Sequence, residues 1–305
     1  MATHTFTPTK YHITMAAHEP VLRIADGDTV VTTTIDARGG DASDTIVAER
    51  GNPQTGPFYV EGAEPGDALA ITFDRIMPNR RRGFTGALIA ERILEPAFVR
   101  TLPPKREVNW DVDVDKGTVT LTDEQSPING YTVPMVPMIG CFGVAPPRKQ
   151  AISTATSYVN GGNMDYRGHV AGVTVYFPVA EPGGLFHLGD GHAVQGDGEI
   201  VGTGVEISMD VQFTARVVKN SNIIWPRTEN DVELMAFGNA RPLDEALQYA
   251  TTELLRWLEA DYNLDTESAS IILGQTIEYE IANVFDPAYT VVAKIRKSWL
   301  EQLAK

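Results

Sequence analysis

The sequence has one cysteine, Cys141, and no apolar run approaches the roughly 18 residues that a transmembrane helix needs. A single cysteine excludes an intramolecular disulfide and fits a reducing compartment. Residues 1–20 contain neither the basic segment nor the apolar segment of a signal peptide. These absences predict a cytoplasmic protein without a membrane span.

Basic residues are scarce, because 25 Lys and Arg stand against 40 Asp and Glu, which gives a formal net charge of −15 at pH 7. Nucleic acids and anionic membranes both attract basic surfaces. We therefore expect neither nucleic acid nor a membrane as a partner.

Strand-like sequence dominates residues 1–220, and glycine-containing turns interrupt it. Asp115-Lys116-Gly117 interrupts one alternating run and predicts a β-hairpin. Asp111, Asp113 and Asp115 have the spacing of an EF-hand, but the twelfth position is Thr122 instead of glutamate. A hairpin with a solvated acidic face is therefore the preferred interpretation.

Two other segments are interpreted from their turn residues and prolines. Asp26-Gly27-Asp28 lies between two β-rich runs and predicts another hairpin. Val133–Gln150 is apolar but rich in proline and glycine, and proline is excluded from the interior of a helix or a central strand. We expect a buried, irregular connector there.

The last quarter of the chain changes to helical periodicity. Apolar residues recur at helical spacing from Leu243, and Pro242 suits the first turn of a helix. A second short helix over residues 266–275 and a strand should follow. The expected fold is mostly β, with a sandwich or barrel-like core over residues 1–220 and a smaller α+β part over residues 221–305, packed together as one unit.

The glycine-rich stretch Gly183–Glu206 concentrates acidic and imidazole side chains. In an extended segment Asp190 and His192 point to the same side, as do Asp197 and Glu199. Carboxylates and imidazoles are ligands for zinc and other first-row dications. Spacing alone leaves two interpretations open, a metal site or a cluster of turns on the surface.

Two other acidic residues also lie beside glycines. Asp165 follows Gly161-Gly162 and precedes strand-like sequence, and Asp36 precedes Gly39-Gly40. Acidic residues thus lie beside glycines in three separate segments, which we call the three corners. This repetition favours acidic side chains that converge on one point over turns on an ordinary surface.

Five segments resemble the acetamidase/formamidase family and occur in the order typical of it. They are GDTVVTTTIDARGG (27–40), NPQTGPFYVEGAEPGDAL (52–69), PMIGCFGVAP (137–146), GGNMD (161–165) and LGDGHAVQGDGE (188–199). The resemblance runs from about residue 18 to 218. It implies a largely β, metal-linked amidase, distinct from the serine and cysteine amidases.

This resemblance assigns expected roles to residues of the three corners and their surroundings. The expected metal ligands are Asp36, Asp165, Asp190 and His192. The candidates for general acid or base are Glu199, Asp197 and Glu206. The candidates for substrate contact are His187, Asn160 and His18. Zinc is the first choice of metal, with calcium or another dication as alternatives.

Two of these positions depart from the family pattern. Family members often carry a histidine where this chain has Asn160, and a small residue is more usual where this chain has His187. Both positions are expected to flank the pocket, so they leave the acyl group of the substrate open.

A nucleophilic cysteine is the competing chemistry. Cys141 has an apolar context, and no basic residue follows it until Arg148. A thiolate there would lack the positive neighbours that lower its pKa, so a buried core cysteine is the preferred interpretation.

The expected reaction is hydrolysis of a small aliphatic amide, such as formamide or acetamide, by a metal-activated water. Hydrolysis of another linear or cyclic C–N bond on the same site stays open, and so does a metal-binding β module without catalysis. The expected partner is a small amide, and the expected assembly is a homo-oligomer, a dimer or higher.

Overall fold

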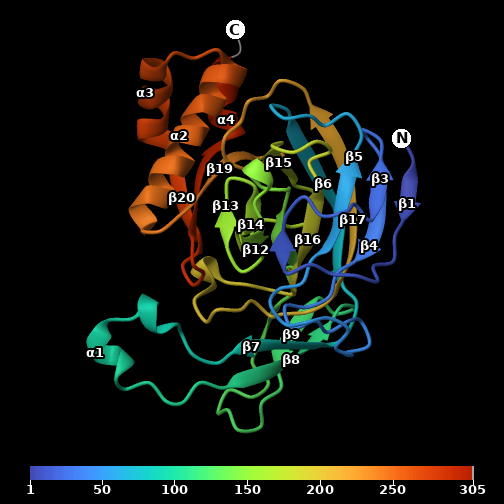
Figure 1. Ribbon diagram of the computed structural model, residues 1–305. Helices are drawn as coiled ribbons and strands as arrows, with labels where there is room; N and C mark the ends of the chain where they lie inside the picture. The colour runs from blue at the N-terminus through green and yellow to red at the C-terminus, as the bar shows by residue number, and fades with distance from the viewer. Residues whose placement is uncertain (304–305) are drawn as a thin grey trace.

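The computed structural model describes residues 1–303, and Figure 1 shows that strands make up most of its regular structure. The largest sheet has nine strands, in the order β1 (Thr3–Thr5), β4 (Thr29–Thr33), β17 (Met209–Val218), β6 (Ala68–Pro78), β15 (Thr174–Pro178), β18 (Arg227–Glu229), β19 (Glu233–Ala240), β21 (Tyr289–Arg296) and β20 (Glu278–Asn283).

A second sheet has six strands, in the order β13 (Ser157–Tyr158), β14 (Gly161–Asn163), β11 (Met138–Gly143), β16 (Phe186–His192), β5 (Thr55–Val60) and β3 (Leu22–Ile24). Two smaller sheets join β10 (Thr132–Pro134), β9 (Thr118–Leu121), β8 (Glu107–Asp113) and β7 (Arg82–Gly86), and join β12 (Ile152–Ser153) to β2 (Thr14–Met15).

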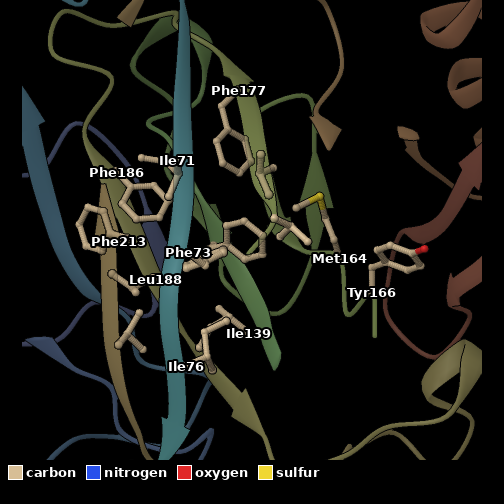
Figure 2. Close-up of a cluster of buried hydrophobic side chains, with 14 of the residues drawn as sticks. Ile71, Phe73, Ile76, Ile139, Met164, Tyr166, Phe177, Phe186, Leu188 and Phe213 are labelled. Carbon is tan, nitrogen blue, oxygen red and sulfur yellow. The ribbon is translucent and has the colours of Figure 1, made fainter. Parts of the chain in front are cut away.

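Aromatic side chains pack the two large sheets against each other. Phe73 of β6 meets Phe142 of β11 edge to face at 5.0 Å between ring centroids, and Phe186 of β16 meets Phe213 of β17 at 5.1 Å. Figure 2 shows Phe73, Phe186 and Phe213 meeting between the sheets with Ile71 and Leu188. The expected mostly β, sandwich-like fold is therefore confirmed.

The helices gather near the C-terminus and cover one end of the nine-stranded sheet (Figure 1). They are α2 (Leu243–Tyr262), α3 (Thr266–Thr276) and α4 (Lys297–Leu300), whereas α1 (Pro96–Val99) lies apart from them. The apolar face of α2 buries Leu254 and Leu258 in a cluster with Ile295 of β21. Pro242 is the N-cap residue of α2, one place before the predicted first turn.

Two of the sequence predictions about local structure were wrong. Val133–Gln150 contains the buried strand β11, because its prolines flank Met138–Gly143 and leave every backbone donor of that strand free to pair. Asp26–Asp28 forms a turn, but β3 on one side pairs with β5 and β4 on the other pairs with β17. The turn therefore carries the chain from one sheet to the other.

The hairpin at Asp115–Gly117 is confirmed, since β8 and β9 pair antiparallel. No helix within residues 1–303 has the length and apolar character that crossing a membrane requires.

Candidate functional site

Strand β16 carries the centre of the candidate site. Asp190 and His192 are two residues apart in this strand, and 3.5 Å separates His192 Nε2 from Asp190 Oδ1. Glu206, which forms an isolated bridge with His192, brings Oε1 to 2.9 Å from the same nitrogen. All three side chains are buried. Within the described residues 1–303, His192 Nε2 nevertheless forms no hydrogen bond of acceptable geometry.

Three more carboxylates surround this trio from other parts of the chain. Asp165 follows β14, Glu199 ends the short 3-10 helix η3 (Asp197–Glu199), and Asp286 precedes β21. The side-chain amide of Asn283, at the end of β20, donates to Asp165 Oδ2 at 2.7 Å and to Glu199 Oε2 and Asp286 Oδ2 at 3.0 Å each. One neutral amide therefore holds three acidic groups together.

The backbone is strained where it presents three of these acids. Asp165, Asp190 and Glu199 have φ values of 42°, 62° and 48°, in the left-handed region that non-glycine residues seldom adopt. Such outliers cost of order 1–3 kcal/mol each and concentrate at functional sites. The strain lies on the acids themselves, since neither Gly189 nor Gly191 has a positive φ.

Gln195 fixes the orientation of the histidine ring. His192 Nδ1 lies 2.8 Å from Gln195 Oε1, and the amide nitrogen of Gln195 donates to the backbone oxygen of Asp165 at 2.6 Å. Because that amide nitrogen is committed as a donor, Oε1 accepts and Nδ1 carries the proton. In the neutral form, which is the form that binds a cation, His192 would present the lone pair of Nε2 to Asp190 and Glu206.

Burial sets the protonation of the cluster. It raises the pKa of Glu206 to about 8 and that of Asp286 to about 7, and it raises the pKa of Asp165 and Glu199 well above the usual range. Burial acts to lower the pKa of His192, but the neighbouring Glu206 and Asp190 raise it well above its usual value. This many acidic groups need either protons or a cation to balance them.

The cluster opens to solvent through a cavity of about 200 Å³. Its buried lining includes Asp190, Glu199, Glu206 and Asp286, and exposed Arg50 also contributes. The remaining lining residues are Ala37, Arg38, Gly51, Asn52, Phe84, Ala155, Asn163, Gly202 and Thr203.

Two predicted site residues lie outside this cluster. Both oxygens of Asp36 are committed, since Oδ1 accepts from the backbone of Arg38 and Gly40 and Oδ2 pairs with Arg80 at 2.5 Å. The structure therefore does not bring Asp36, which was predicted as a metal ligand, into the cluster, because its carboxylate pairs with Arg80. Asp197 is 51% exposed and pairs with Arg167, so it does not face the cavity either.

The three residues predicted to contact substrate, His18, His187 and Asn160, lie outside the acidic cluster and its cavity. His18 stacks on His12 with 3.9 Å between ring centroids, and the ring of His187 lies 5.9 Å from that of His18. Asn160 donates to the backbone oxygen of Val144 at 2.9 Å. None of them lines the cavity above the acidic cluster.

The sequence matches the model of the Acetamidase/Formamidase family over residues 9–150 and 147–230, which is more than half of the chain. The chain belongs to this family.

Two acetamidases have similar structures. That of Yersinia enterocolitica gives a TM-score of 0.83 at 32% identity, over 98% of this chain and 93% of the other. That of Bacillus halodurans gives a TM-score of 0.83 at 29% identity, over 99% of this chain and 100% of the other. A formamidase of Methylophilus methylotrophus is 26% identical over 213 residues, or 54% of this chain. The chain spans 51% to 61% of the length of the curated relatives that it matches.

In this member of the family, Cys141 is buried, as expected. Its Sγ donates to the backbone oxygen of Thr154 at 3.3 Å. Burial raises the pKa of the thiol, and the nearby carboxylates of Asp190 and Asp165 raise it further. A thiolate is therefore disfavoured at this position.

Replacing Cys141 by serine should leave the amide turnover expected from the family within a few-fold of the parent, because the serine hydroxyl can donate to the same Thr154 carbonyl. Initial rates of ammonia release from acetamide measure this. A variant that keeps the thermal stability of the parent but shows no turnover would instead identify Cys141 as a nucleophile.

The sequence interpretation missed Gln195, Asn283 and Asp286. Gln195 lies inside the family motif LGDGHAVQGDGE, between His192 and Glu199, so the motif could have identified it. Asn283 and Asp286 lie in a segment whose sequence, IANVFDP, carries no signal of ligand binding. Only the pairing of β20 with β21 brings them to the acids of the site.

Proposed function

We propose that the chain is a metal-dependent amidase that hydrolyses small aliphatic carboxamides to a carboxylate and ammonia. The observation that carries the proposal is the convergence of the buried carboxylates of Asp190 and Glu206, which line a small cavity, on His192 Nε2, a buried nitrogen without a hydrogen-bond partner. The names of the similar acetamidases and of the related formamidase support the choice of substrate.

The residues present fit a divalent cation. Within residues 1–303, two groups can each offer three ligand atoms within 4.8 Å of one another, and His192 belongs to both. We assign Asp190, His192 and Glu206 as the ligands. Glu206 Oε1 lies 2.9 Å and Asp190 Oδ1 lies 3.5 Å from His192 Nε2, and these distances resemble those between ligands that share one ion. Two ligands about 2.1 Å from a tetrahedral zinc lie roughly 3.4 Å apart. Zinc is the first candidate.

A divalent cation held there would lower the pKa of a coordinated water toward 7 and polarise the amide carbonyl. Glu199 is our candidate for the general base, because its carboxylate lines the cavity and burial raises its pKa above the usual value. It takes one proton from the attacking water and gives it to the departing nitrogen, so the C–N bond breaks and ammonia leaves. Asn283 holds Glu199 Oε2 during this exchange.

The test is metal analysis of the purified chain, together with ammonia release from formamide, acetamide and propionamide before and after chelation. We expect about one dication per chain, loss of turnover on chelation and recovery on adding zinc. Full activity of the metal-free protein would end the metal hypothesis. A metal-loaded chain that hydrolyses no amide would be a binding module, and turnover of cyclic amides alone would change the substrate class.

Replacing Gln195 by leucine should weaken metal binding and turnover by about 10–100-fold, because the His192 ring then loses the acceptor that orients it. Metal affinity by competition with a chelator measures the effect. Gln248→Leu on the exposed face of α2 is the matched control. Unchanged affinity in the Gln195 variant would show that packing alone orients the ring.

We further propose that the chain forms a homo-oligomer through an arm made of residues 87–106. The arm contains η1 (Glu91–Ile93) and α1, neither of which buries a residue, and Phe98 is 57% exposed. Figure 1 shows α1 projecting away from the sheets. The arm has four basic and two acidic residues, so it complements the acidic remainder of a second copy.

Replacing Phe98 by aspartate should therefore shift the assembly toward monomer in sedimentation velocity. Ile271→Asp, at a 64% exposed site on α3, is the matched control and should leave the assembly unchanged. An oligomer that survives Phe98→Asp would assign the interface to another surface.

A further inference from the structure

The rim of the catalytic cavity has the opposite charge to its floor. Asp190, Glu199 and Glu206 are buried at the floor, whereas Arg38 is half-buried and Arg50 is exposed. Both arginines line the same cavity of about 200 Å³. In a chain with a net charge of −15, two neighbouring cations at one opening need a specific explanation.

The two arginines differ in their partners. Arg38 is held in place, because its guanidinium pairs with Glu107 and lies 4.0 Å over the ring of Phe84. Arg50 has no ion-pair or hydrogen-bond partner for its guanidinium within residues 1–303. Burial and then the charge of Arg50 lower the pKa of Arg38, so the two guanidinium groups feel each other's charge.

The backbone around Arg50 is fixed although its side chain is exposed. The amides of Gly51 and Asn52 donate to the backbone oxygen of Ala37, at 3.3 and 3.1 Å. This contact ties the segment of Arg50 to the turn that carries Arg38. The carboxylate of Asp36 orders that turn by accepting from the backbone of Arg38. Backbone hydrogen bonds therefore order both segments of the rim, and the guanidinium of Arg50 remains free to bind a ligand.

We propose that this site prefers amides that carry a second, anionic group, such as the monoamide of a dicarboxylic acid, with Arg50 binding the distal carboxylate. The inference rests on the proposed amidase function and adds a substrate class to it. The amide end occupies the floor beside Glu199 and Glu206, and the carboxylate end reaches the rim. Hydrolysis adds one water, breaks the C–N bond, and yields a dicarboxylate and ammonia.

The test compares succinamate with 4-oxopentanamide, a neutral amide of nearly the same size. We expect kcat/KM to be at least tenfold higher for succinamate, since a charge-assisted contact is about twice as strong as a neutral one. Arg50→Gln should remove that preference and leave acetamide turnover within about twofold. Arg50→Lys should keep part of that preference. Arg216→Gln, an equal charge change on an exposed residue outside the cavity, should keep all of it.

A wild-type protein that hydrolyses acetamide but shows no preference for succinamate would overturn the inference, as would an Arg50→Gln variant that loses both substrates equally. A binding measurement separates this failure from a failure of the proposed function. Calorimetry of the metal-loaded protein should show succinate binding at least tenfold more tightly than 4-oxopentanoate, with the difference lost in Arg50→Gln. Equal binding of the two would also overturn the inference, even if no amide is hydrolysed.

Discussion

Replacing His192 by alanine is expected to remove the proposed metal ion and to lower amide turnover by at least about 10²-fold. His192 Nε2 lies within 3.5 Å of both Asp190 and Glu206, and it belongs to both groups of ligand atoms at the site. Its loss leaves carboxylates alone, and these repel one another without the imidazole between them. Metal content per folded chain and initial rates of ammonia release measure the effect.

Three outcomes separate the possible roles of His192. Loss of both metal and turnover identifies a ligand, which we expect. Normal metal content with turnover reduced by roughly 10²–10⁴-fold would identify a general acid or base. Normal metal content and normal rate would make the histidine structural. His169→Ala is the control, since His169 is equally buried but contacts Thr228 and Phe237 instead of the acids.

Replacing Gly140 by alanine is expected to abolish the proposed metal binding and amide turnover while the fold survives. A Cβ atom at Gly140 of β11 would lie 2.2 Å from Asp165 Oδ1 and 2.9 Å from Asp190 Oδ2. Both carboxylates must then move, and overpacking of this kind costs typically 1–3 kcal/mol. Thermal unfolding together with metal analysis measures the two effects separately.

Gly274→Ala is the matched control for that substitution. Gly274 lies in α3, and a Cβ atom there would meet nothing within 4 Å. Alanine should therefore stabilise the chain by up to about 1 kcal/mol, because it has the better helix propensity. A Gly140→Ala variant with normal metal content would show that the acids have room to rearrange.

The sequence predicted the parts of the site that are local. Asp190 and His192 are two residues apart in one strand, and strand periodicity alone puts them on the same side, where the structure has them. Strand-like runs and the helical stripe that begins at Leu243 likewise predicted the mostly β fold and helix α2. These features depend on neighbours in the sequence, so periodicity is enough to find them.

Periodicity failed where proline and glycine were the main signals. The prolines around β11 indicated an irregular connector, because the sequence does not show which backbone groups will be paired. The turn at Asp26–Asp28 was correctly placed, yet it joins two sheets instead of two neighbouring strands. A turn signal specifies the local bend, whereas the partner of each flanking strand is set by packing.

The sequence by itself determined the family, the fold class, and the pairing of Asp190 with His192 in one motif. Only the tertiary structure decided which other acids join them. Asp36 and Asp286 both lie in turns, but Arg80, 44 residues along the chain, neutralises Asp36, whereas strand pairing carries Asp286 to the site. A carboxylate is available to bind a ligand when no basic side chain of the protein forms an ion pair with it. Whether such a pair forms depends on contacts between residues far apart in the sequence.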